Sequence, residues 1–167
     1  NESGTPQEVT ITITENESTP VVTLATSASS IAENAGSSLT LTATLSVATT
    51  ADVTVGISTS GTGTEGTDYG TISDITISAG ATTGTASFTP TDDSTYEGNE
   101  TGVVAIDSVS GGSANESGTP QEVTITITEN ESAPVVTLAT SASSIAENAG
   151  SSLTLTATLS VATTADV

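Results

Sequence analysis

The chain has 167 residues and a formal net charge of −20, from 20 Asp and Glu residues with no Lys, Arg or His. Cys is absent too, so the sequence excludes a Ser-His-Asp triad, a Cys nucleophile, an ordinary zinc site and a cationic surface for nucleic acid or an anionic membrane. No apolar run approaches the roughly 18 residues of a membrane span, and Thr, Ser, Val and Ile dominate, which is typical of strands rather than of a disordered acidic chain.

Alternation of apolar and polar residues predicts seven strands. In chain order they are Val21–Leu24, Leu39–Leu45, Val53–Ile57, Ile72–Ile77, Ala86–Phe88, Val104–Ile106 and Val123–Ile127. Clusters of Gly, Ser, Asn and Asp separate them, as expected for turns. The pattern predicts an all-β fold, a seven-stranded immunoglobulin-like sandwich. With only Tyr69, Phe88 and Tyr96 as aromatic residues, we expect a thin, aliphatic core.

Two segments of the chain are almost identical. Asn1–Val53 and Asn115–Val167 align without gaps and differ only where Thr19 becomes Ala133. The period of 114 residues is too long for a solenoid unit and suits one sandwich domain. We therefore predict a head-to-tail tandem array: residues 1–18 are the last strand and linker of a preceding repeat, 19–132 one complete sandwich, and 133–167 the first strands of a following repeat. We expect the chain to be a slice of a longer fibre.

Strand direction predicts where the acidic residues gather. In a sandwich of alternating antiparallel strands, the connections after the first, third and fifth strands and the end of the seventh share one pole. Nine of the 14 acids of the complete unit fall there: Glu33, Glu65, Asp68, Asp92, Asp93, Glu97, Glu100, Glu129 and Glu131. The opposite pole receives Asp52, Glu116 and Glu122, and Asp74 and Asp107 lie within strands.

Nine carboxylates without a cation should repel one another, each close pair by about 1–4 kcal/mol depending on the local dielectric. We therefore expect counter-charge from outside the chain. Clustered carboxylates and backbone carbonyls are the oxygen ligands that Ca²⁺ prefers, whereas Mg²⁺ keeps its waters and demands a stricter geometry. The cluster predicts Ca²⁺ as the bound cofactor; the alternative is a merely solvated acidic surface.

Several short motifs of the unit resemble those of the Calx-β domain, a family found in sodium–calcium exchangers and in many large bacterial surface proteins. In chain order the motifs are Ile31–Asn34, Gly66–Tyr69, Thr91–Ser94, Tyr96–Thr101, Val123–Ile127 and Glu129–Glu131. The resemblance covers essentially the whole unit. It implies a sandwich fold and, in the members that bind it, calcium.

The resemblance also implies a ligand set. Carried over to matching positions, the metal ligands are Glu33, Asp68, Asp92, Asp93, Glu97, Glu129, Asn130 and Glu131. The repeat adds the equivalent residues of the neighbouring units, Glu15, Glu17 and Glu147. The sequence departs from the family pattern at Ser94, where a third acid is frequent, at the Glu-Asn-Glu end, where an Asp run is frequent, and at Gly102, where an aromatic residue is usual.

We expect a structural function: a repeat of an extracellular filament, adhesin stalk or biofilm matrix fibre at the cell surface. Calcium bound beside the short linker Glu129–Pro134 would stiffen the fibre, and Pro134 restricts the linker further. The expected partners are neighbouring identical repeats of the same chain, with lateral contacts between fibres left open. Nucleic-acid partners and direct membrane insertion are not expected.

Two other functions remain as alternatives. A calcium-sensing regulatory module of a larger membrane or secreted protein predicts divergent domains, whereas these repeats are nearly identical. An enzyme is not expected, because the sequence offers no nucleophile–base pair. Paired carboxylates can cleave glycosides, but three aromatic residues are too few to line a sugar-binding cleft.

Overall fold

The computed structural model describes residues 8–14, 16–118, 121–164 and 166, and these residues form strands and loops without a helix. The all-β prediction is therefore confirmed. None of the described residues belongs to a helix that could span a membrane. The strands of the complete unit are β1 (Val21–Thr26), β2 (Ser30–Ala32), β3 (Leu39–Leu45), β4 (Val53–Gly61), β5 (Ile75–Ile77), β6 (Thr83–Phe88), β7 (Thr95–Tyr96), β8 (Glu100–Ser110), β9 (Asn115–Glu116) and β10 (Glu122–Thr128).

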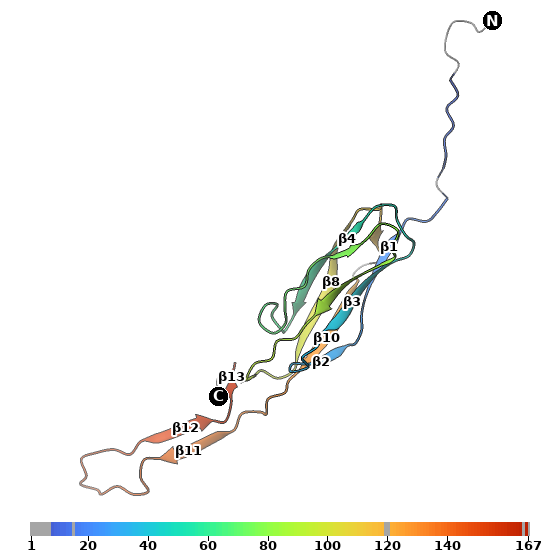
Figure 1. Cartoon of the computed structure of the whole chain (residues 1–167). Helices are drawn as coiled ribbons and strands as arrows, with labels where there is room; N and C mark the ends of the chain where they lie inside the picture. The colour runs from blue at the N-terminus through green and yellow to red at the C-terminus, as the bar shows by residue number, and fades with distance from the viewer. Residues whose placement is uncertain (1–7, 15, 119–120, 165, 167) are drawn as a thin grey trace, which may run out of the picture.

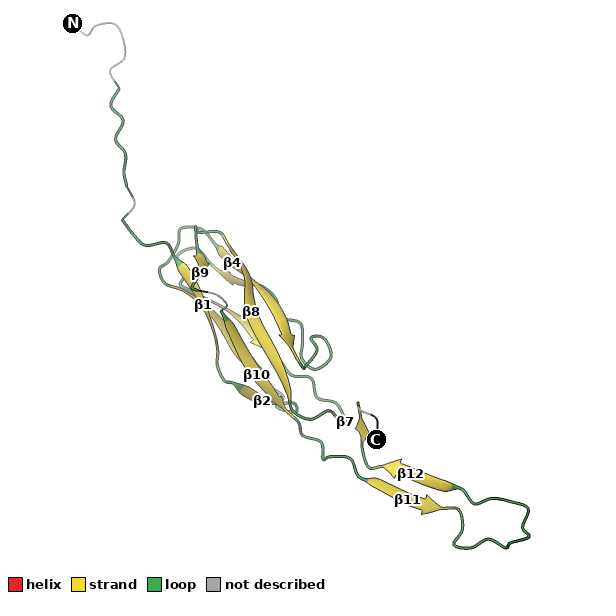
Figure 2. Ribbon diagram, turned by 180° about the vertical axis from the view of Figure 1, so that it is seen from behind, coloured by secondary structure: helices red, strands yellow, loops and turns green. Residues whose placement is uncertain are grey.

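Two sheets form the layers of the sandwich (Figures 1 and 2). One has the strand order β6-β3-β1-β9 and the other β2-β10-β8-β4-β5. The central pairs are antiparallel, with Leu24 opposite Ala43 and Thr59 opposite Val104. A register shift between Gly56 and Ile57 interrupts the β4–β8 ladder.

The core lies between the two sheets and is aliphatic, as expected. Along β3, Leu41, Ala43 and Leu45 are buried, and the intervening threonines point away from the core. Val55 and Ile125 of the facing sheet have no exposed surface. Because burying such a side chain contributes about 1.5–3 kcal/mol, this alternation fixes which face of each strand turns inward.

Two of the three aromatic rings pack against each other at one end of this core. Tyr69 and Phe88 stack with their ring centroids 4.7 Å apart, and both are almost fully buried. A Cβ on Gly102 would lie 2.7 Å from the Phe88 ring. The glycine at this position of β8 therefore leaves the space that the Phe88 ring occupies.

The strand count differs from the seven expected segments. Those segments fall on β1, β3, β4, β5, β6, β8 and β10, but β5 begins at Ile75, so Ile72 is buried outside it. The first strand, β1, is followed by a short strand, β2, that belongs to the other sheet. β1 pairs antiparallel with β3, whereas β2 pairs parallel with β10. Strands such as β2, β7 and β9 have only two or three residues, which is too few to show an alternation in the sequence. Only their pairing with a neighbouring strand identifies them.

The sandwich has two poles. At one pole β1 begins, β3 ends and β4 begins; we call it the entry pole, because the chain enters the sandwich there (Figure 1). At the other pole β4 and β10 end and β8 begins. We call this the acid pole, because it carries Glu33, Glu65, Asp68, Asp92, Asp93, Glu97, Glu100, Glu129 and Glu131.

The described residues before 19 and after 132 form no second two-sheet sandwich. In the following repeat, β11 (Val136–Thr140) and β12 (Leu155–Leu159) pair as an antiparallel hairpin. Leu138 is 70% exposed, although its equivalent Leu24 in the complete unit is 8% exposed. The domain boundaries at residues 18/19 and 132/133 stay a prediction.

Candidate metal centre

Three loops and the chain after β10 converge at the acid pole. Glu33 follows β2, Asp68 lies between β4 and β5, and the turn of residues 92–99, which contains β7, precedes β8. Glu129 follows β10 directly. Because the strands alternate in direction, residues that are up to about 100 positions apart in the sequence become neighbours here.

The first group of acids comprises Glu33, Glu129 and Glu131, which offer carboxylate oxygens that all lie within 4.8 Å of one another. Two ligands of one Ca²⁺ can be about 5 Å apart at most, since each Ca–O distance is roughly 2.3–2.6 Å. The oxygen spacing of this group therefore fits a single calcium ion.

Glu129 is held in place by backbone N–H groups. Its Oε2 accepts hydrogen bonds from Glu97 N at 2.7 Å and Gly98 N at 2.9 Å, and its Oε1 accepts from Asn130 N at 2.9 Å and Glu131 N at 3.0 Å. Burial acts to raise the pKa of Glu129, but backbone N–H donors and a hydrogen bond from the Glu131 side chain outweigh it and lower the pKa to about 2. Glu129 is thus a carboxylate over the whole physiological pH range.

Glu33 is the one buried acid of this group. Burial raises the pKa of Glu33 to about 7, and the negative charges of Glu129, Glu131 and Asp93 add to the rise. The hydrogen bond that Glu33 Oε1 accepts from Asp93 N, at 3.1 Å, acts in the opposite direction. An ionised Glu33 is therefore costly unless a cation compensates for its charge.

Glu131 is the third member of the group, and one of its carboxylate oxygens has no hydrogen-bond donor. Its Oε2 is buried and has no hydrogen-bond partner, while its Oε1 accepts from Asn130 Nδ2 at 3.1 Å. Protonation would let Glu131 donate a hydrogen bond to Glu129, which raises the pKa of Glu131, and burial and the Glu129 charge add to the rise. A buried acceptor without a donor is unfavourable, and a cation beside Oε2 would remove that cost.

The second group comprises Asp68, Glu97 and Glu100, whose carboxylate oxygens also lie within 4.8 Å of one another. Asp68 Oδ2 accepts a hydrogen bond of 2.6 Å from Thr64 N. Burial raises the pKa of Glu100 to about 7, with Asp68 and Glu97 adding to the rise. Burial and the charges of Asp68 and Asp93 raise the pKa of Glu97. As in the first group, burial and neighbouring negative charges make the ionised forms of two members, Glu97 and Glu100, unfavourable.

Five of the sequence-predicted ligands lie in these groups: Glu33, Asp68, Glu97, Glu129 and Glu131. Asp92, Asp93 and Asn130 lie at the same pole but in neither group, and all three are exposed. Asp93 Oδ1 accepts a hydrogen bond of 2.6 Å from Thr95 N within the turn.

Glu100 was missed as a ligand, although the strand-direction argument assigns it to this pole. The family motif contains it, but only the fold shows that its carboxylate reaches Asp68. Glu65 shows the converse: it lies at the pole, yet it accepts hydrogen bonds from Thr59 Oγ1 at 2.6 Å and Ile72 N at 2.8 Å, and so holds its own loop.

Two of the three predicted ligands in the neighbouring units lie elsewhere. Glu17 is exposed and lies beside the entry pole of the complete unit. Glu147, the equivalent of Glu33, is exposed in the loop after β11. Glu15 lies outside the described residues. The structure thus brings neither Glu17 nor Glu147 into either group.

The fold and the site together define a class of protein: an immunoglobulin-like sandwich whose acidic pole offers only oxygen ligands, half-buried and uncompensated by any cation of the chain. The family model of the Calx-beta domain matches residues 5–131. The chain belongs to the Calx-beta domain family, as the sequence motifs predicted.

Solved structures agree with this fold. The chain is similar to the apo-form Calx CBD1 domain, with 17% identity and a TM-score of 0.53 over 68% of this chain and 99% of that chain. It also resembles CBD12 from CALX1.2 (19% identity, TM-score 0.50) and the calcium binding domain CBD12 of CALX1.1 (20%, 0.50), over 59% of this chain and 40% of theirs. No curated protein matches the sequence.

Proposed function

We propose that the chain binds calcium at the acid pole and is a structural repeat of an extracellular filament or adhesin stalk. One observation carries the calcium proposal: Glu33, Glu129 and Glu131 hold three carboxylates within 4.8 Å, one of them buried, in a chain without a single cationic side chain. Family membership supports it, since a similar solved structure is named a calcium binding domain. Asp68, Glu97 and Glu100 offer a second position for an ion.

The position of the site supports a role in stiffening. Glu129 and Glu131 belong both to the first group of acids and to the linker Glu129–Pro134. An ion shared by Glu33, Glu129 and Glu131 would fix the start of the linker to its own sandwich. Near-identity of the repeated segments supports a spacer, because a spacer needs length rather than distinct sites. The same proposal places the repeat outside the cell, at its surface, where calcium is plentiful.

A calcium-sensing module of a larger protein is the second candidate, favoured by the similarity to CBD12 of CALX1.1. Both candidates are non-enzymatic, since the sequence holds no His, Cys, Lys or Arg to act as base, nucleophile or electrophile.

The test of calcium binding is a thermal melt of three consecutive copies of residues 19–132, in saturating Ca²⁺ and in EGTA. Ligand at about 100 times Kd adds about 2.7 kcal/mol to the free energy of unfolding, so we expect Tm to rise by about 10 °C or more. An unchanged Tm in Ca²⁺ would leave the acid pole a solvated surface. A matched melt in Mg²⁺ tests selectivity.

The test of the stalk is the shape of the same three-copy protein, measured by small-angle X-ray scattering. We expect one rigid, extended particle in Ca²⁺ and a more flexible ensemble in EGTA. A regulatory module without a spacer role predicts no such change in length, so equal flexibility in both conditions would favour the second candidate.

A further inference from the structure

Strand β7, in the turn of residues 92–99, pairs with no strand of its own sandwich. It forms a separate two-stranded sheet with β13 (Ala162–Thr163), in which Thr95 lies opposite Ala162 and Tyr96 opposite Thr163, in parallel. β13 belongs to the following repeat. The turn of residues 92–99 thus finds its strand partner across the boundary between repeats (Figures 1 and 2).

The partner segment exists in every copy of the repeat. Val161–Thr164 is identical in sequence to Val47–Thr50, the loop after β3 at the entry pole of the complete unit. The structure therefore contains this loop twice: residues 161–164 lie beside the acid pole of the complete unit, whereas residues 47–50 follow a segment whose described residues, 8–14 and 16–20, form no strand.

The valine that begins the loop differs in burial between the two copies. Val47 is 41% exposed, whereas its equivalent Val161 is only partly exposed, although the described residues after 132 form no second two-sheet sandwich. Glu17 is exposed, and its equivalent Glu131 is half-buried. Val161 and Glu131 are thus less exposed than Val47 and Glu17. Thr163 is more exposed than Thr49, whose carbonyl accepts a hydrogen bond from Gly80 N inside the complete sandwich.

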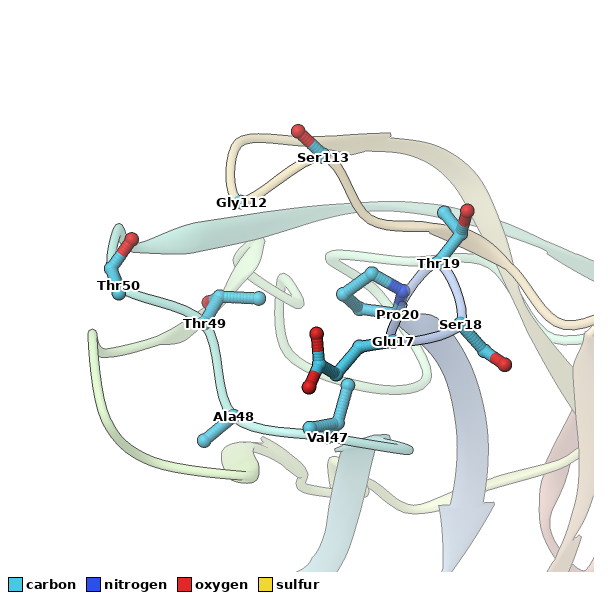
Figure 3. A pocket seen from close by; sticks show the side chains of 10 residues that line it. All are labelled: Glu17, Ser18, Thr19, Pro20, Val47, Ala48, Thr49, Thr50, Gly112 and Ser113. Atoms are coloured by element: carbon cyan, nitrogen blue, oxygen red, sulfur yellow. The ribbon is translucent and has the colours of Figure 1, made fainter. Parts of the chain in front are cut away.

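The free copy borders a hollow at the entry pole. The hollow has a volume of about 380 Å³ and lies between the Val47–Thr50 loop, the incoming segment Glu17–Pro20 and Gly112–Ser113. Figure 3 shows the side chain of Glu17 extending towards its middle, between Val47 and Thr49. In the second copy, the equivalent of this side chain is Glu131, a member of the first group of acids.

We propose that consecutive repeats are joined by this strand pairing: the acid-pole turn of one sandwich adds a parallel strand to the entry-pole loop of the next. The occupant of the surface around Val47 is therefore the Thr95–Tyr96 strand of the preceding copy. The proposal rests on the tandem arrangement in the proposed function, but not on calcium. The contact is heterologous, since it joins two different surfaces of the repeat, and such contacts extend into open filaments.

Two carboxylates of the acid pole position β7 for this pairing. On one side of it, Asp93 N donates to Glu33 Oε1, and on the other side Glu97 N donates to Glu129 Oε2. Both acceptors belong to the first group of acids. The two carboxylates thus anchor the turn at both ends of the strand that it presents to the next repeat.

Disulfide cross-linking tests the pairing, because the chain has no Cys of its own. The protein to use is two complete copies, residues 19–132 followed by the following repeat completed to the same length. Each copy can fold alone, since the core residues of the unit lie between Val22 and Ile127. Thr95→Cys is combined with Ala162→Cys. Opposed residues of neighbouring strands have Cα atoms about 5 Å apart, within the disulfide range of roughly 4.4–6.8 Å.

In Ca²⁺ and diamide we expect near-complete cross-linking within single chains, independent of protein concentration. The matched control, Thr95→Cys with Ala142→Cys, places the second thiol in the far loop between β11 and β12 (Figure 1) and should not cross-link. Cross-linking no faster than in the control, or only between separate chains, would overturn the pairing. A calcium titration of the same sample keeps the two proposals apart, since the pairing can fail while calcium still binds.

Discussion

The backbone N–H of Glu97 donates a hydrogen bond of 2.7 Å to Oε2 of Glu129. The acceptor begins the linker and the donor belongs to the turn before β8, so this bond ties the exit of the sandwich to one of its loops. The same oxygen accepts from Gly98 N. The backbone N–H groups of Glu131, Glu97 and Gly98 and a hydrogen bond from the Glu131 side chain outweigh the effect of burial and lower the pKa of Glu129 to about 2.

Replacing Glu129 should remove the hydrogen bonds that tie the linker Glu129–Pro134 to the turn of residues 92–99. In Glu129→Ala, four backbone N–H groups lose their acceptor, and we expect the free energy of unfolding in EGTA to fall by about 1–3 kcal/mol. Calcium should then stabilise the variant much less than the parent. Chemical denaturation in EGTA and in Ca²⁺ measures both effects. Glu122→Ala, an exposed acid at the entry pole, is the matched control and should change neither; an equal loss there would contradict this account.

Glu33→Gln should shift stability in opposite directions with and without calcium. The amide removes a buried charge whose pKa is raised to about 7 yet can still accept from Asp93 N. We therefore expect the calcium-free protein to become more stable by about 1–3 kcal/mol while its affinity for calcium falls. Denaturation in EGTA and calorimetric titration with Ca²⁺ give the two numbers. A variant that is less stable without calcium would argue against an unfavourable Glu33 charge.

Without calcium, stability should depend on pH because of Glu33 and Glu100. Their folded-state pKa values are raised to about 7 from 4.5, so between these values the folded state binds more protons than the unfolded state, and stability falls as pH rises. We expect Tm in EGTA to increase as pH is lowered from 8 to about 5. Below about 4.5 Glu129, with its pKa of about 2, should reverse the trend. Melts across this range check the sign, and Tm that rises steadily with pH would contradict it.

Gly102→Ala should destabilise the sandwich through steric overlap. The added Cβ would lie 2.7 Å from the Phe88 ring, and overpacking of this kind costs about 1–3 kcal/mol. The control is Gly70→Ala, where a Cβ meets nothing closer than Thr89 O at 3.9 Å. Urea denaturation of both variants measures the loss in the free energy of unfolding at each position, which we expect only for Gly102→Ala. If both lose the same stability, the overlap at Phe88 is not the cause.

Leu41 and Leu155 occupy the same position of the repeat, yet they should respond differently to truncation in this chain. Leu41 has no exposed surface and Leu155 is 67% exposed. We expect Leu41→Ala to cost about 2–5 kcal/mol and Leu155→Ala almost nothing. The comparison needs no outside control, because the two sites share their sequence neighbours. Equal costs would mean that the following repeat is packed more closely than the hairpin β11–β12 indicates.

Much of the candidate site was predictable because it depends on the direction of the strands. Alternation along segments such as Leu39–Leu45 identifies strands, and the alternating strand directions then bring Glu33, Asp68, Glu97 and Glu129 to one pole. Glu100 as a group member was not predictable, since it begins β8 and only packing shows which way its carboxylate turns. The local contact of Asp93 was not predictable either: its Oδ1 accepts from Thr95 N within the turn.

By itself, the sequence determined the β-sandwich class, the repeat, the absence of cationic chemistry and the pole at which the acids gather, because all of these follow from local periodicity, composition and strand parity. Tertiary structure alone decided which carboxylates meet, which are buried, and that β7 pairs with the next repeat. The identical segments make the reason plain. Leu24 and Leu138 have the same neighbours in sequence, but only Leu24 has the facing sheet that removes it from water.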